Sequence, residues 1–89
     1  MSKAQKILHS METFLEAHQV SIEYGSGNFY GGVCTLNQAR RIVVNRHIPV
    51  EEQIMILAKS FWDMQIDFDG LSKQALEFVM KFSPDEKAD

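Results

Sequence analysis

Residues 40–65 read RRIVVNRHIPVEEQIMILAKSFWDMQ and decide the fold of this chain. The first six of them have a β-branched centre, which is typical of a strand. Pro49 and the acidic pair that follows it are typical of a helix N-terminus, because proline suits the first turn and carboxylates complement the helix dipole. We therefore expect a strand over 40–45 and a helix over 51–65.

The expected helix over 51–65 is apolar at five successive positions, from Ile54 to Ala58. Since consecutive residues point to different sides of a helix, such a helix has to be covered on more than one side. We expect the sheet to cover one side. Other helices of the chain, or a second subunit, would cover the other.

Further helices and strands flank this segment. Residues 20–24 alternate apolar and polar side chains, as a half-buried strand does, and residues 29–36, FYGGVCTL, form another β-prone run. Residues 71–82 have helical spacing, and Asp69 is placed to cap that helix. Residues 2–18 form one more amphipathic helix, with an apolar face made of Ile7, Leu8, Met11, Phe14 and Leu15.

The three strand runs are joined by short links with turn residues, GSGN at 25–28 and NQA at 37–39. Short links of this kind predict an antiparallel meander. The predicted fold is therefore α+β, a three-stranded antiparallel sheet packed with three helices in the order αβββαα. A chain of 89 residues fits one domain. We expect it to span 1–83, with a flexible C-terminal tail over 84–89.

Composition narrows the partners that the protein can have. A net charge of −3 and a pI of about 5.5 argue against nucleic acid and anionic membranes, since both reward a basic surface. No run approaches the roughly 20 apolar residues of a membrane-spanning helix, and the N-terminus has no signal-peptide apolar run. We expect a cytoplasmic protein with no membrane partner.

Cys34 is the single cysteine, so the chain has no internal disulfide and no multi-cysteine zinc site. A thiolate beside an imidazole is a strong nucleophile, and His9, His18 and His47 are the histidines available. Cys34 is therefore the one candidate catalytic residue, for a small enzyme or redox protein. The alternative interpretation is a small buried hydrophobe in a strand. We expect no metal site and no cofactor.

Arg40, Arg41 and Arg46 give the last strand run a basic character. One hypothesis is a nucleic-acid-binding module, with nearby aromatic rings stacking on bases. The other is that the arginines flank an edge strand and deter aggregation. Gly31-Gly32 indicates either a bulge or a close approach of the backbone to another group, a ligand included. No lysine and Ser/Thr follow it, so it is not a phosphate-binding loop.

Residues 31–62, GGVCTLNQARRIVVNRHIPVEEQIMILAKSFW, place a strand that ends in Asn45 before a proline, two glutamates and a helix with Ala58. This stretch resembles the strand-to-helix region of the ImmA/IrrE-type metallopeptidases, and small bacterial proteins with the same layout. In those peptidases His-Glu-x-x-His follows the alanine matched by Ala58. Here Lys59, Ser60 and Asp63 replace the first zinc ligand, the general base and the second ligand. The resemblance therefore implies the scaffold and not the hydrolytic activity.

These observations favour a non-enzymatic interaction module that forms a homodimer or binds another protein. Met55, Lys59 and Trp62 of the expected helix over 51–65 are the candidate interface residues, and tryptophan is enriched at interface hot spots. The competing interpretation is that Met55 and Trp62 pack against helices of the same chain.

Overall fold

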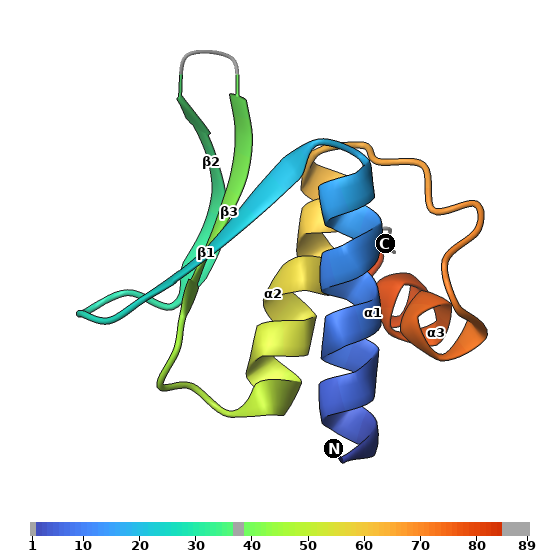
Figure 1. Ribbon diagram of the computed structural model, residues 1–89, viewed down its shortest axis with the longest axis horizontal. Helices are drawn as coiled ribbons and strands as arrows, with labels where there is room; N and C mark the ends of the chain where they lie inside the picture. The colour runs from blue at the N-terminus through green and yellow to red at the C-terminus, as the bar shows by residue number, and fades with distance from the viewer. Residues whose placement is uncertain (1, 37–38, 85–89) are drawn as a thin grey trace.

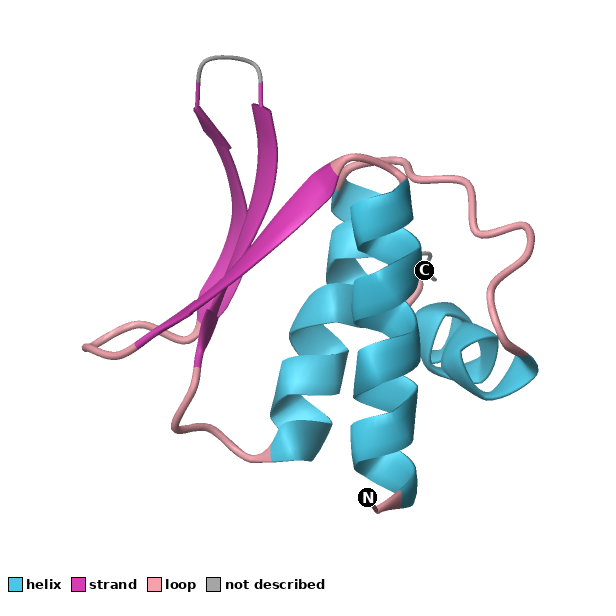
Figure 2. Cartoon of the chain, in the orientation of Figure 1, coloured by secondary structure: helices cyan, strands magenta, loops and turns pink. Residues whose placement is uncertain are grey.

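The computed structural model describes residues 2–36 and 39–84. It confirms an α+β chain with the element order αβββαα (Figure 2). Of the tail expected over 84–89, residues 85–89 lie outside the described residues. The elements are α1 (Lys3–Ala17), β1 (Val20–Gly25), β2 (Gly31–Leu36), β3 (Ala39–Asn45), α2 (Val50–Asp63) and α3 (Lys73–Lys81).

The sheet is mixed, with the strand order β1-β3-β2. β1 runs parallel to β3 and places Gly25 opposite Asn45, whereas β2 runs antiparallel to β3 and places Gly31 opposite Val44. The expectation of an antiparallel meander is therefore wrong. A period of two shows which face of a strand is buried, but it does not show which strand is its neighbour.

The loop between β1 and β2 allows β3 to lie between these two strands. The last residue of β1 and the first residue of β2 lie at the same end of β3, and the loop crosses that end. The Asn45 N–H donates to the Tyr30 carbonyl at 3.0 Å, and the Arg46 N–H donates to the Gly25 carbonyl at 2.8 Å. One residue thus bonds to the start of β2, and the next residue bonds to the end of β1. The five-residue loop is long enough to let β3 enter between its neighbours.

The helices lie on one side of the sheet (Figure 1). α1 packs against β1, and α2 packs against β2 and β3. α3 packs against α1 and α2 and does not contact the sheet. Within residues 2–36 and 39–84, no helix covers the opposite face of the sheet. β2 and β3 extend past the helices where β2 ends and β3 begins (Figure 1).

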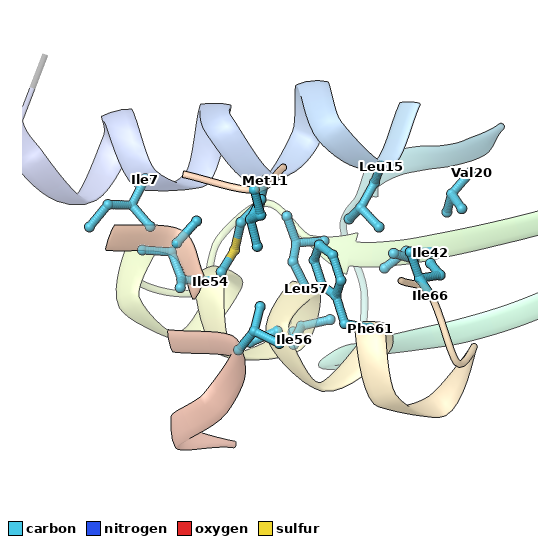
Figure 3. Close-up of a cluster of buried hydrophobic side chains, with 14 of the residues drawn as sticks. Ile7, Met11, Leu15, Val20, Ile42, Ile54, Ile56, Leu57, Phe61 and Ile66 are labelled. Atoms are coloured by element: carbon cyan, nitrogen blue, oxygen red, sulfur yellow. The ribbon is translucent and has the colours of Figure 1, made fainter. Parts of the chain in front are cut away.

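The core forms where α1 and α2 face each other. Figure 3 shows side chains of α1 pointing toward those of α2, with Phe61 between the helices and the sheet. α1, α3 and the sheet of the same chain therefore cover the apolar sides of α2. The fully buried large apolar side chains are Met11, Leu15, Val20, Ile42, Val44, Ile54, Leu57, Phe61 and Val79.

Capping residues set the helix starts. Ser2 and Gln5 form a capping box at α1, with two hydrogen bonds of 3.1 Å. α3 is capped by Ser72, which accepts from the Ala75 N–H at 3.4 Å, so the expectation that Asp69 caps this helix is wrong. Gly70, with φ +96°, turns the chain before the helix can start. No helix in the described part of the chain is long and apolar enough to cross a membrane.

Candidate functional site

β2 is an edge strand, and its free edge carries unpaired backbone groups. It is paired with β3 on one side, and no described strand lies on the other. Because the Tyr30 carbonyl accepts from a β3 N–H, the alternation of an antiparallel ladder turns the N–H and C=O groups of Gly31, Val33 and Thr35 away from β3. These three residues form the free edge of β2.

The free edge of β2 lacks two of the features that usually protect an edge strand. Its sequence, GGVCTL, contains no charged residue and no proline, which are two of the usual devices against unwanted strand pairing. Tyr30 and Val33 are 48% and 36% exposed. β1, at the other edge, carries Glu23, whose carboxylate lies 3.6 Å from Arg41 Nε. The two edges of the sheet therefore differ in chemistry.

A groove of about 150 Å³ lies between β2 and α2. Lys59 and Asp63 are exposed and stand one helical turn apart on its α2 wall. Ser60 is buried, and its hydroxyl donates to the Ile56 carbonyl at 2.7 Å. Two opposite charges are thus available to a partner along this groove. The lining residues are Tyr30, Gly31, Gly32, Met55, Ile56, Lys59, Ser60 and Asp63.

The paired glycines mark a close approach within the chain. A Cβ at Gly31 would lie 2.5 Å from the Val43 carbonyl oxygen and 2.9 Å from Ile56 Cδ1, and Gly31 has φ +146°. A Cβ at Gly32 would meet nothing within 4 Å. Pairing of β2 with β3 is continuous across both glycines, so they do not form a bulge.

Two of the expected interface residues, Met55 and Lys59, meet Gly31-Gly32 at the groove. Trp62 lies elsewhere: its indole N–H donates to the Val79 carbonyl at 2.7 Å, and its ring packs edge-on against Phe68. Sequence reasoning missed Tyr30 and Asp63 as groove residues. Asp63 could have been found from the sequence, because it lies one helical turn after Lys59. Tyr30 could not, because its place at the groove depends on β2 being an edge strand.

Cys34 is exposed on β2, opposite Arg41. Alternation along the strand places it on the sheet face away from the helices. The interpretation of Cys34 as a buried hydrophobe is therefore wrong. His18 Nδ1 lies 2.9 Å from the Phe14 carbonyl oxygen, and no described interaction joins a histidine to Cys34. In the described part of the chain, no three His, Cys, Asp or Glu side chains gather as metal ligands.

The three arginines contact other groups of the same chain. Arg40 donates to the His18 carbonyl at 2.9 Å, and Arg46 donates to the Tyr24 carbonyl at 3.1 Å. Arg41 forms the ion pair with Glu23, which is too long for a hydrogen bond and leaves its buried Nε without an acceptor. β3 is the central strand, so the idea that these arginines flank an edge strand is wrong. Arg40 and Arg46 are separated by about 20 Å of extended strand and do not form one patch.

A larger groove, of about 650 Å³, lies between α1, α2 and α3 near their N-termini. Two lysines, Lys3 and Lys73, and two glutamates, Glu51 and Glu77, line it together with apolar side chains. Its formal charges balance, and it contains none of the candidate catalytic, interface or nucleic-acid-binding residues that the sequence indicated.

The chain matches no protein-family model, no curated protein and no solved structure. No relative therefore bears on its family or its function.

Proposed function

We propose that the protein is a non-enzymatic interaction module, and that a partner chain adds an extended segment to the free edge of β2. The observation that carries this proposal is the row of outward N–H and C=O groups of Gly31, Val33 and Thr35 beside an open groove. In strand addition, backbone hydrogen bonds supply affinity and pockets for alternate side chains supply specificity.

α2 supplies the side-chain contacts of this proposal. Every second side chain of an added strand would point toward the helices and reach Met55, Lys59 and Asp63 along the groove. Methionine adapts its shape to different partners, and the charges of Lys59 and Asp63 favour a partner with complementary charges. The expected interface of Met55, Lys59 and Trp62 is thereby narrowed to its first two members, since Trp62 bonds within the chain.

We also propose that the resemblance to the ImmA/IrrE-type metallopeptidases is one of scaffold. Lys59, Ser60 and Asp63, which stand at the positions of the His-Glu-x-x-His motif, line the groove beside β2. Zinc hydrolysis needs imidazole ligands and a carboxylate that activates water. With lysine, serine and aspartate at these positions, the groove is suited to binding a segment and not to cleaving it.

The alternatives have less support from the contacts. Cys34 is accessible, but none of the described interactions supplies a base or an orienting group for it. Arg40, Arg41 and Arg46 are engaged with carbonyl groups or a carboxylate of the chain. A phosphate backbone would have to compete with these contacts.

A selection of displayed seven-residue peptides tests the proposed function. Peptides that bind the wild-type protein should lose at least about tenfold in affinity on Thr35→Pro, because proline has no N–H to donate to the added strand. Thr35→Val, which keeps the N–H and the branched side chain, is the matched control and should bind as the wild type does. The Thr35 N–H points away from β3, so Thr35→Pro leaves the β2–β3 ladder paired.

Backbone NMR of the same titration locates the bound peptide. The amide resonances of Gly31, Val33 and Thr35 should shift most, and their hydrogen exchange should slow. Thermal melts by circular dichroism confirm that both Thr35 variants are folded. Peptides that bind Thr35→Pro and the wild type equally well, with shifts away from β2, would refute the proposal.

A further inference from the structure

We infer that the partner at the free edge of β2 is a second copy of this chain, paired antiparallel about a twofold axis at Val33. This inference rests on the proposed function and adds the identity of the partner. This pairing joins the two three-stranded sheets into one continuous six-stranded sheet, in which both edges of β2 are hydrogen-bonded.

The chemistry of β2 suits pairing with itself. Its six residues carry no charge, so a twofold axis brings no like charges together along the strand. In each copy, β2 has an unpaired edge and is itself β-prone, so β2 of one copy can pair with β2 of the other. β2 and β3 extend past the helices, which leaves this part of the edge accessible to a second copy (Figure 1).

The register follows from two constraints. An antiparallel twofold pair keeps the helices of both copies on the same side of the joined sheet, so opposite residues must belong to the same face. The outward groups of Gly31, Val33 and Thr35 must also face each other. Val33 opposite Val33, with Gly31 opposite Thr35 on either side, meets both constraints and pairs all three outward residues. An axis at Cys34 would pair only Val33 with Thr35 within the described strand.

The charges on α2 fit the same axis. Twofold symmetry makes α2 and its copy antiparallel, and Lys59 and Asp63 are one turn apart on the groove wall. The proposed dimer pairs Lys59 of each copy with Asp63 of the other copy. Opposite charges therefore meet on both sides of the axis, which steers association and disfavours other arrangements.

Sedimentation equilibrium up to about 200 µM tests the dimer. The wild-type protein should be dimeric, and Val33→Lys should raise the dimer Kd at least about tenfold, because it places two ammonium groups at the axis. Val33→Thr is the matched neutral control and should stay within about threefold of the wild type. Val33 is 36% exposed, so each variant should fold.

A charge exchange on α2 tests the arrangement without touching β2. Lys59→Glu alone and Asp63→Lys alone should each weaken the dimer about three- to tenfold, since each places like charges across the axis. The double variant should regain most of the wild-type affinity. A double variant as weak as the single variants would overturn the twofold arrangement.

Cys34 reports the register. With the axis at Val33, the two Cys34 residues are diagonal neighbours about 7–8 Å apart, which is beyond the usual separation in a disulfide. A short bismaleimide should therefore link them, and oxidation alone should not. Efficient disulfide formation on oxidation would place the axis at Cys34 and overturn the register.

The outcomes separate this inference from the proposed function. A monomer at about 200 µM that still binds extended peptides at β2 overturns the second copy and leaves the proposed function standing. A dimer that Val33→Lys does not weaken lies at another surface and also overturns the inference. A monomer that binds no extended peptide overturns both.

Discussion

The Asn45 side-chain amide donates to the carbonyl oxygen of Phe29 at 2.7 Å. The same Nδ2 donates to the Gly27 carbonyl at 3.0 Å, and Oδ1 accepts from the His47 N–H at 2.9 Å. Asn45 is 8% exposed, and its own carbonyl lies 3.4 Å from the side-chain amide of Gln53. One amide group therefore holds the loop that crosses β3 and shapes the turn into α2.

Asn45→Ala should lower the free energy of unfolding by about 2–4 kcal/mol, because three hydrogen bonds are lost at a buried position. Urea denaturation followed by circular dichroism measures the change. Asn28→Ala, at an exposed position of the same loop, is the control and should stay within about 0.5 kcal/mol of the wild type. Equal effects of the two substitutions would show that Asn45 does not organise the loop.

Gly31→Ala should be much more destabilising than Gly32→Ala. Both glycines have a positive φ, so each substitution costs about 1–3 kcal/mol in backbone strain. At Gly31 the added methyl group also overlaps the Val43 carbonyl oxygen and Ile56, which adds about 1–3 kcal/mol. Urea midpoints of the two variants give the comparison. A smaller loss for Gly31→Ala than for Gly32→Ala would contradict the close approach of β2 to β3.

Trp62→Phe should lower the free energy of unfolding by about 1–2 kcal/mol. Phenylalanine has no N–H to donate, so the half-buried hydrogen bond to the Val79 carbonyl is lost. The ring contact with Phe68 is largely kept. Met80→Ala, at a position on α3 that is 52% exposed, is the control and should be close to neutral. If Trp62→Phe changed the dimer Kd and left monomer unfolding unchanged, Trp62 would be an interface residue instead.

Tyr24 should make stability fall at high pH. Burial, and then its hydrogen bond to the Glu12 carboxylate, raise the pKa of the Tyr24 hydroxyl well above its usual range. Above about pH 10 the unfolded chain releases this proton while the folded chain keeps it, so the unfolded state binds fewer protons. This part of the stability is complete below about pH 10 and is lost as the pH rises beyond it.

Unfolding midpoints from pH 8 to 11 check this expectation. The wild-type protein should lose stability above about pH 10, and Tyr24→Phe should lose less over the same interval. Absorbance at 295 nm in the Tyr30→Phe variant follows the ionisation of Tyr24 alone. Parallel pH profiles for the wild type and Tyr24→Phe would mean that Tyr24 ionises equally readily in both states.

The parts of the fold that sequence predicted are those set by local chemistry. α1 was predicted from its apolar spacing alone, and its Ser2–Gln5 capping box was seen only in the structure. α2 begins after Pro49, and its apolar centre required cover on more than one side, which α1, α3 and the sheet provide. The start of α3 was misplaced, because Asp69 and Ser72 are both good capping residues and only the turn at Gly70 selects between them.

The candidate site was predicted in part. Gly31-Gly32 was singled out as a bulge or a close approach, and Met55 and Lys59 were singled out as interface residues; all four residues meet at one groove. Nothing local indicates that this groove exists, since its walls come from segments about 25 residues apart whose contact depends on strand order. The arginines were misinterpreted for the same reason, because the central position of β3 cannot be read from residues 40–45.

The sequence by itself determined the helices, the three strands and their order along the chain, since periodicity and capping act over a few neighbouring residues. Only the tertiary structure decided that β3 lies between β1 and β2, and hence that the uncharged β2 is an edge. The physical reason is that strand neighbours are chosen by long-range hydrogen bonds and by a loop held on Asn45, which the alternation within each strand does not encode.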